Sequence, residues 1–151
     1  MEIRQTVANG MPIVNGIWYL EQQAVIRHRI WDTPSGRRLT PMKQLERPQF
    51  GQRYLFFNHG QIAVPETDYV FCFGRLRDPR CGQMYLAQPD KGKILWVASF
   101  AYAAPFLKGR CHGRHIMLAS EDGEMWQVDL TDPLNVQITI MAQTGLIQHI
   151  K

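Results

Sequence analysis

The stretch that decides the fold is His115-Ile-Met-Leu-Ala-Ser-Glu-Asp-Gly-Glu-Met-Trp-Gln-Val-Asp-Leu130. The Asp-Gly pair at its centre lies between two apolar runs, and such a pair is among the strongest short-range signals of a β-hairpin. Apolar and polar residues alternate over residues 125–130, as in a strand with one buried face. A turn at residues 131–135 then precedes a second alternating run at residues 136–141. The sequence therefore predicts a three-stranded antiparallel meander.

Two earlier stretches follow the same order of strand, polar turn, strand, Pro-containing turn and strand. In their second turns, Asp32-Thr-Pro-Ser-Gly36 and Gln88-Pro-Asp-Lys-Gly92, proline presets φ and glycine permits a positive φ. The expected strands are residues 16–20, 25–31 and 37–40 in the first stretch, and 69–74, 83–87 and 93–99 in the second. These patterns predict three similar units, at about residues 13–45, 66–100 and 112–143.

The segments between the units carry other signals. Residues 53–57 and 61–64 flank Asn58-His-Gly60, which indicates a further hairpin. Residues 41–48 are bounded by prolines and are expected to hold one helical turn, whereas residues 100–105 fit either a strand end or a short helix. No segment shows twelve or more residues of clean helical periodicity.

These elements predict an all-β fold in a single domain, residues 1–151, built from about three antiparallel units of three to four strands. Residues 116–130 resemble the inner hairpin of a β-propeller blade, which has an apolar strand, an Asp-Gly turn, an aromatic residue and an aspartate near the strand end. The resemblance implies a propeller-like architecture and points to no particular family. Because closed propellers have about four to eight blades, three units imply a partial ring that a second copy completes. A β-sandwich, a barrel or an open sheet is the alternative, and an ordinary meander with similar hairpins also fits.

The composition is that of a folded chain with its own core. With 151 residues, 45% of them hydrophobic and 20% charged, the chain needs no disulfide or metal to hold a core. It has no run of eighteen apolar residues and no start like a signal peptide, so we expect a cytoplasmic protein without a membrane segment. We expect its three cysteines to be free thiols. Cys72 lies in an apolar run and is expected to be buried, while Cys81 and Cys111 lie in Arg-rich loops that could meet.

The net charge of +4 is unevenly distributed along the chain. Residues 1–60 and residues 61–114 each hold eight basic and four acidic residues, whereas residues 115–151 hold one basic and five acidic residues. A basic second unit and an acidic third unit would attract each other between copies, which predicts a homo-oligomer.

Arginine-rich loops supply the candidate binding residues, because the planar guanidinium fork suits carboxylate and phosphate groups. The candidates are Arg75, Arg77, Arg80, Arg110, His112 and Arg114. They would bind an acidic protein face, a nucleotide or a nucleic acid; alternatively they form solvated loops in which Asp78 pairs locally. Arg27 and Arg29 share a strand face with Trp31, which is only a weak nucleic-acid signal, so we expect no nucleic-acid partner.

Catalytic motifs are not seen, and we expect no metal and no cofactor. Cys111 and His115 could supply two zinc ligands, but no second Cys/His pair has suitable spacing. Cys111 with His112 or His115 is the one nucleophile–base pair to name. The tight turn at residues 121–124 is expected to direct its carboxylates into water. The four tryptophans, spread over all three units, suit core packing or a sugar-binding platform.

The leading hypothesis is therefore a non-catalytic binding module that associates with a protein partner or with a second copy of itself. The first alternative is an immunity or toxin-neutralising protein. The second is a binder of a small carbohydrate or anion, or an enzyme, that uses the Arg and His loop residues.

Overall fold

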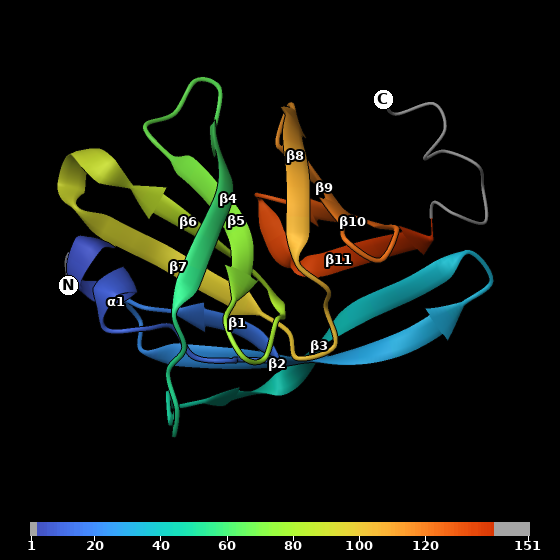
Figure 1. Ribbon diagram of the computed structural model, residues 1–151, viewed down its shortest axis with the longest axis horizontal. Coiled ribbons are helices and arrows are strands. Elements are labelled where there is room, and N and C mark those ends of the chain that lie inside the picture. Colours follow the sequence, from blue (N-terminus) through green and yellow to red (C-terminus); the bar gives the residue numbers. More distant parts are fainter. Residues whose placement is uncertain (1–2, 141–151) are drawn as a thin grey trace.

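The computed structural model describes residues 3–140, which form eleven antiparallel strands and two short helices (Figure 1). The first strands are β1 (Gly16–Tyr19), β2 (Ala24–Thr33), β3 (Gly36–Glu46), β4 (Phe56–Ala63), β5 (Val70–Leu76) and β6 (Gly82–Gln88). The remaining strands are β7 (Lys93–Ser99), β8 (Phe106–His112), β9 (His115–Ser120), β10 (Glu124–Asp129) and β11 (Asp132–Ile140). The helices are α1 (Ile3–Ala8) and the 3₁₀ turn η1 (Pro89–Lys91), and no helix in this range is long and apolar enough to cross a membrane.

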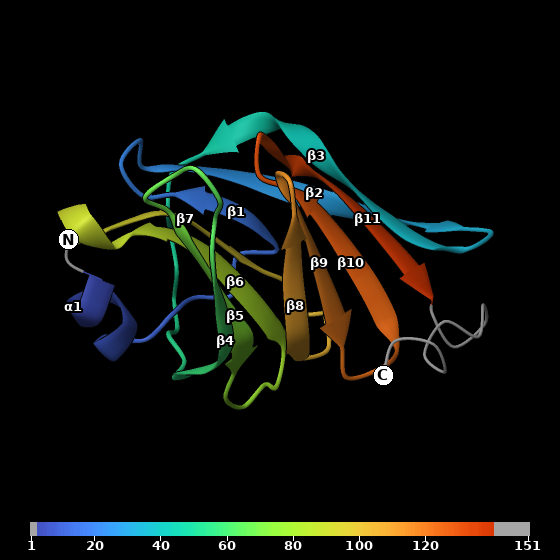
Figure 2. The same ribbon diagram turned by 90° about the horizontal axis from the view of Figure 1, so that it is seen from above.

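All eleven strands belong to one sheet, in the order β4-β5-β6-β7-β1-β2-β3-β11-β10-β9-β8. The sheet is rolled into a nearly closed barrel, so that its two edge strands, β4 and β8, come into contact (Figure 2). Because the number of strands is odd and every neighbouring pair is antiparallel, the two edge strands run in the same direction. An antiparallel ladder therefore cannot close this barrel, and no backbone ladder joins β4 to β8 within residues 3–140.

Side chains close the seam between β4 and β8. The ring of Phe73, from β5, lies against Gly60 of β4 and Gly109 of β8, and a Cβ atom at Gly60 would overlap this ring. A Cβ atom at Gly109 would lie 3.0 Å from the same ring and 2.7 Å from Leu118. A ring nitrogen of His59 (Nδ1) is hydrogen-bonded to the carbonyl oxygen of Phe106 at 2.8 Å. The two glycines thus let an aromatic ring fill the seam.

The barrel interior is filled by large apolar side chains from every part of the sheet. Trp126 is fully buried and its ring centroid lies 5.3 Å from that of Phe100 and 5.2 Å from that of Phe106. Phe71 packs edge-on against Trp96 at 6.1 Å. Trp126, from the stretch on which the fold prediction rests, therefore lies within the inner core together with Ile116, Leu118 and Val128.

A second core lies on the outer face of the sheet. It is formed where residues of β5, β6, β7, β1 and β2 meet the N-terminal segment and the chain that leads into β4. Its buried residues are Met11, Val14, Trp18, Val25, Cys72, Leu76, Cys81, Tyr85, Ala87, Ile94 and Val97. The partly buried Ile3 and Val7 of α1 pack against it. Strand β6 is consequently buried on both faces, which is why its sequence lacks alternation.

The predicted all-β fold is confirmed, in its barrel form. The strands expected in the three units appear as the consecutive meanders β1–β2–β3, β5–β6–β7 and β9–β10–β11, and these are joined by backbone pairing in one sheet. Part of the third predicted unit, residues 141–143, lies outside the described residues. The turn at Asp122-Gly123 is confirmed, with φ of 87° at Gly123.

Two local predictions are wrong. Residues 41–48 do not form a helical turn, because β3 continues to Glu46 and pairs with β2 again at Leu45 and Glu46. Residues 53–64 do not form a hairpin. Instead β4 is one strand with a bulge, in which the side-chain oxygen of Asn58 accepts a hydrogen bond from the N–H of Gly60.

The predicted turn at residues 131–135 is confirmed in part, because the chain turns at Thr131 and β11 pairs in register with both β10 and β3 only from Val136 onward. The carboxylate of Asp129 accepts hydrogen bonds from the N–H and the hydroxyl of Thr131, so the chain turns there and β11 already begins at Asp132. The ambiguous residues 100–105 form a loop that begins with a turn, in which the N–H of Ala103 donates to the carbonyl of Phe100.

Replacing Gly60 by alanine should destabilise the seam, because the added methyl group overlaps the ring of Phe73. We expect the free energy of unfolding to fall by about 1–3 kcal/mol, as for other overpacked cores. Urea denaturation followed by tryptophan fluorescence would measure the change. Gly51→Ala is the matched control, since a Cβ atom there meets nothing within 4 Å.

The double variant Gly60→Ala/Phe73→Leu tests the cause of this destabilisation. It separates steric overlap of the new methyl group with the Phe73 ring from a loss of backbone flexibility in β4. If the ring of Phe73 is the obstacle, the two substitutions together should cost clearly less than the sum of their separate effects. Strict additivity would contradict the assigned packing.

His28 is a buried titratable group in the barrel wall. Its Nε2 is hydrogen-bonded to the carbonyl oxygen of Leu134 at 2.8 Å, and its ring packs edge-on against Phe100 at 5.8 Å. Burial lowers the pKa of His28 below its ordinary value, although hydrogen bonds to backbone carbonyls partly offset this effect.

Because the pKa of His28 is lowered in the folded protein, the free energy of unfolding should depend on pH in a defined direction. The unfolded chain binds the proton more tightly than the folded chain, so stability should fall as the pH drops from about 7.5 to about 5.5. The His28→Gln variant should lose less stability over this pH range than the unchanged protein. Thermal unfolding of both proteins at a series of pH values would measure it, and parallel profiles would contradict a buried neutral His28.

Candidate functional site

The outer face of β2, β3, β11, β10, β9 and β8 is the part of the barrel wall that the second core leaves uncovered. Strand pairing aligns one exposed or half-exposed side chain from each of these six strands in a row. In order from β8 to β2, the row is Arg110, Met117, Gln127, Gln137, Arg38 and Trp31. Since strands lie about 4.8 Å apart, the row spans about 24 Å. We call this surface the outer face.

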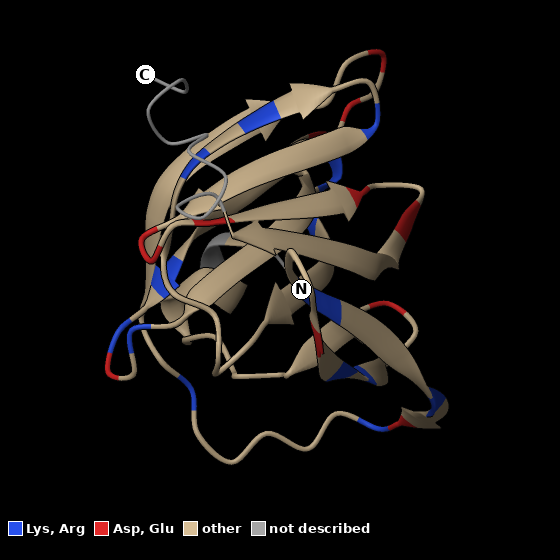
Figure 3. Ribbon diagram, turned by 90° about the vertical axis from the view of Figure 1, so that its right-hand side faces the viewer, with Lys and Arg blue, Asp and Glu red and all other residues tan. Residues whose placement is uncertain are grey.

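Basic side chains dominate the outer face. Besides Arg110 and Arg38, the alternation of the strands directs Lys108 and Arg29 outward. Among the described residues, Asp129 and Glu46 are acidic side chains that face outward from paired parts of these strands, and Glu46 forms an ion pair with Arg27 at 2.9 Å. Figure 3 shows the same division, with basic residues along strands and many of the acidic residues at turns or strand ends. Basic side chains therefore outnumber acidic ones on the outer face, although both signs of charge are present.

Two grooves mark the ends of the row. The groove near β8 has a volume of about 540 Å³ and is lined by Arg110, Cys111, His112, His115, Met117 and Gln127. The groove near β2 has a volume of about 430 Å³ and is lined by Arg29, Trp31, Thr40, Pro41, Met42, Lys43 and Gln44. The indole N–H of Trp31 donates a hydrogen bond to the hydroxyl of Thr40 at 2.7 Å, which holds a half-exposed aromatic ring in place.

Asp129 is engaged within the molecule. Hydrogen bonds from the side chain and the backbone of Thr131 lower the pKa of Asp129, and His115 lies 3.8 Å from its carboxylate. The lowered pKa keeps the Asp129 carboxylate ionised at neutral pH, so Asp129 offsets part of the positive charge of the outer face.

The six binding residues predicted from the sequence fall into two groups at opposite ends of the barrel. Arg75, Arg77 and Arg80 belong to the end of β5 and the loop that follows it. The Arg75 guanidinium lies 4.6 Å from the centre of the Phe57 ring, Arg77 lies 3.6 Å from the carboxylate of Asp78, and Arg80 pairs with Glu121 at 3.1 Å. These three side chains thus have partners within the chain.

The second group lies near the turn between β8 and β9. Arg110 and His112 point outward from β8 and line the groove there, and Arg114 is exposed in the turn itself. The structure therefore brings Arg110, His112 and Arg114 together and separates them from Arg75, Arg77 and Arg80. The binding role of both groups stays a prediction.

Cys111 faces the barrel interior, between two outward residues of β8. It packs against the inner core, and its thiol is hydrogen-bonded to the carbonyl oxygen of Gly113 at 3.1 Å. Cys111 and His112 thus lie on opposite faces of one strand, which does not suit a nucleophile and its base. All three cysteines are free, and no three His, Cys, Asp or Glu side chains within residues 3–140 are grouped to hold a metal ion.

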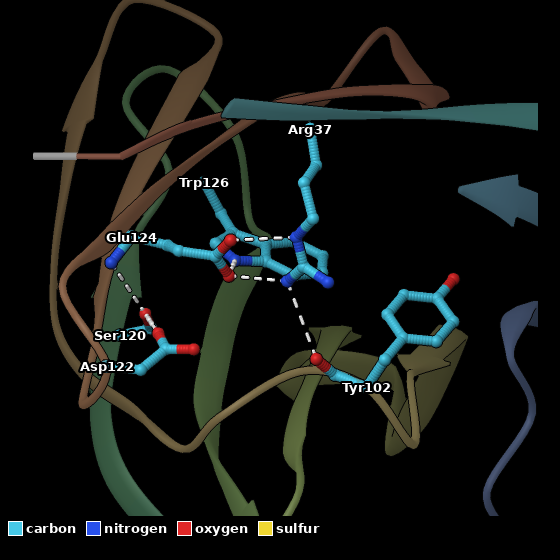
Figure 4. Close-up of polar contacts among 6 residues, drawn as sticks. All are labelled: Arg37, Tyr102, Ser120, Asp122, Glu124 and Trp126. Carbon is cyan, nitrogen blue, oxygen red and sulfur yellow. Dashed lines mark hydrogen bonds and ion pairs between the residues drawn. The ribbon is translucent and has the colours of Figure 1, made fainter. Parts of the chain in front are cut away.

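A buried ion pair is the polar site that the sequence reasoning missed. The guanidinium of Arg37 donates two hydrogen bonds to the carboxylate of Glu124, at 2.8 and 2.5 Å, and a weaker one to the carbonyl of Tyr102 at 3.5 Å (Figure 4). The indole N–H of Trp126 donates to the same carboxylate at 3.3 Å. The prediction that Glu124 points into water is therefore wrong: its side chain is only 9% exposed.

This ion pair shows how the uneven charge of the chain is used. Glu124 and Glu121, from the acidic third unit, pair with Arg37 of the first unit and Arg80 of the second. The opposite charges thus meet within one chain. They contribute to closing the fold, and fewer of them are free to act between copies.

No protein-family model matches this chain, and no curated protein is similar to it in sequence.

Glu124→Gln should destabilise the fold more than Glu121→Gln, although each substitution removes one carboxylate that is paired with an arginine. Arg37 would keep its buried charge without a counterion, at a cost of about 2–4 kcal/mol in the free energy of unfolding. The exposed pair Arg80–Glu121 should contribute less than about 1 kcal/mol. Urea denaturation would measure both, and equal effects would contradict the structural role of the buried pair.

Proposed function

We propose that this chain is a non-catalytic binding module and that the outer face binds an acidic region of a protein partner. The observation that carries the proposal is the row of long side chains from Arg110 to Trp31 across six strands. Arginine and tryptophan are the residue types that most often dominate binding at protein interfaces. Glutamine side chains between them supply both hydrogen-bond donors and acceptors.

The mechanism is recognition by a rigid surface. The row lies on paired strands that cover a packed core. Because the backbone under these side chains is already ordered, binding costs little further backbone entropy. The basic residues would attract an acidic partner over a distance of about one Debye length, and binding should weaken as salt is added. Trp31, held by Thr40, would supply apolar contact at one end of the row.

Charge reversal on the outer face should abolish most binding of an acidic polypeptide. Poly-L-glutamate with a fluorescent label serves as the probe, and fluorescence anisotropy at low and moderate salt gives the affinity. We expect the Arg38→Glu/Arg110→Glu variant to bind about five- to thirtyfold more weakly than the unchanged protein, at about 0.5–1 kcal/mol per reversed charge.

The control is Arg77→Glu/Lys91→Glu, which changes the net charge equally at two exposed positions away from the outer face. It should bind the probe nearly as well as the unchanged protein. Equal weakening by both variants would show a non-specific effect of net charge and would contradict the proposed face. A single-stranded oligonucleotide that binds much more tightly than poly-L-glutamate would replace the protein partner by a nucleic acid.

A further inference from the structure

The groove near β8, about 540 Å³ in volume, is a hollow of the outer face bordered by nitrogen-bearing side chains. We call it the β8 groove. Arg110, His112 and His115 line it and are exposed, while Met117 and the amide of Gln127 line it from half-buried positions. Its lining in the described part of the chain includes no carboxylate. The β8 groove is therefore suited to an anion.

Strand pairing sets the spacing of the side chains around the β8 groove. In the ladder of β8 with β9, His112 lies opposite His115 and Arg110 lies opposite Met117. Neighbouring strands are about 4.8 Å apart, and residues two positions apart along one strand are about 6.8 Å apart. The four residues thus form a rectangle with basic side chains at three corners and Met117 at the fourth. A small anion above its centre is within reach of all three basic side chains.

Arg110 and His112 are available to a ligand. Within residues 3–140, neither side chain forms a hydrogen bond or an ion pair with another protein group, whereas the three arginines near the end of β5 all have partners. His115 lies 3.8 Å from the carboxylate of Asp129. Because Asp129 lies opposite His115 on β10, it is on the far side of His115 from His112. The β8 side of the groove is therefore its most basic part.

We infer that the β8 groove binds the phosphate group of a phosphorylated serine or threonine in the acidic partner. The phosphate site is part of the outer face, so it rests on the proposed function. A carboxylate has two oxygens, which the fork of the Arg110 guanidinium alone can satisfy, and the two histidines would be left without a partner. A phosphate monoester has three terminal oxygens and a charge of about −1.5 to −2 at neutral pH. It can therefore accept hydrogen bonds from Arg110, His112 and His115 together.

Two labelled peptides test the phosphate site by fluorescence anisotropy. The first has one central phosphoserine flanked on each side by alternating Glu and Ala, and the second has Glu in place of the phosphoserine. The unchanged protein should bind the phosphopeptide at least about tenfold more tightly, because one further charge-assisted hydrogen bond has about this effect on affinity. A preference below about threefold, which the extra charge alone would give, would overturn the phosphate site.

Substitutions around the groove test where the phosphate binds. Arg110→Gln/His112→Gln changes two exposed side chains, and it should reduce the preference for the phosphopeptide to less than about threefold. Lys108→Gln is the control, since it removes one charge from the outward side of β8 at a position that does not line the groove. It should weaken binding of both peptides alike and keep their ratio. A double variant with an unchanged ratio would contradict the assigned residues.

The phosphate site and the proposed function fail in different ways. If poly-L-glutamate binds at the outer face but the phosphopeptide is not preferred, the phosphate site is wrong and the proposed function stands. If the phosphopeptide is preferred but poly-L-glutamate does not bind, the groove takes phosphate and the proposed function is wrong. Adenosine monophosphate supplies a phosphate without an acidic segment. If it binds as tightly as the phosphopeptide, the assignment to a phosphorylated protein partner is overturned.

Discussion

The structure depends on how an odd number of antiparallel strands closes. With eleven strands, β4 and β8 meet in parallel, so the strongest form of sheet pairing is not available to the seam. Closure instead rests on side-chain packing, with the ring of Phe73 lying against Gly60 and Gly109. The buried pair of Arg37 and Glu124 acts with it, because it links β3 to β10 and to the loop that leads into β8. A barrel held in this way is more sensitive to side-chain volume at the seam than to any single backbone hydrogen bond.

Much of the fold could be predicted because local signals in this chain agree with the final structure. The Asp-Gly turn and the alternation of residues 124–129 follow from turn chemistry and from the burial of one face. The prediction failed where a local signal was overridden by tertiary pairing. Asn58-His-Gly60 reads as a hairpin turn, yet β5 offers a continuous partner and the extra residue becomes a bulge. The closing contact of β4 with β8 leaves no pattern in the sequence, because residues about fifty positions apart meet there through sheet curvature.

The candidate site was harder to predict than the fold, because successive side chains of a strand point to opposite faces of the sheet. Arginines that are close in sequence, such as Arg37 and Arg38, point to opposite faces of one strand: Arg37 is buried in an ion pair, while Arg38 joins the outer face. Counting basic residues in a loop cannot separate these roles. The spacing of Glu124, Trp126 and Val128 was the available signal, since it places the carboxylate on the buried side of β10.

The location of the exposed surfaces follows from how the barrel wall is covered. The N-terminal segment and α1 cover the outer face of β5, β6, β7 and β1, so that half of the wall is buried on both sides and its composition is fixed by packing. The other half, from β2 to β8, needs apolar residues only on its inner side. Its outer side can carry Arg, Gln and Trp without removing apolar contacts from the barrel interior. The uneven cover of the barrel wall thus creates the outer face.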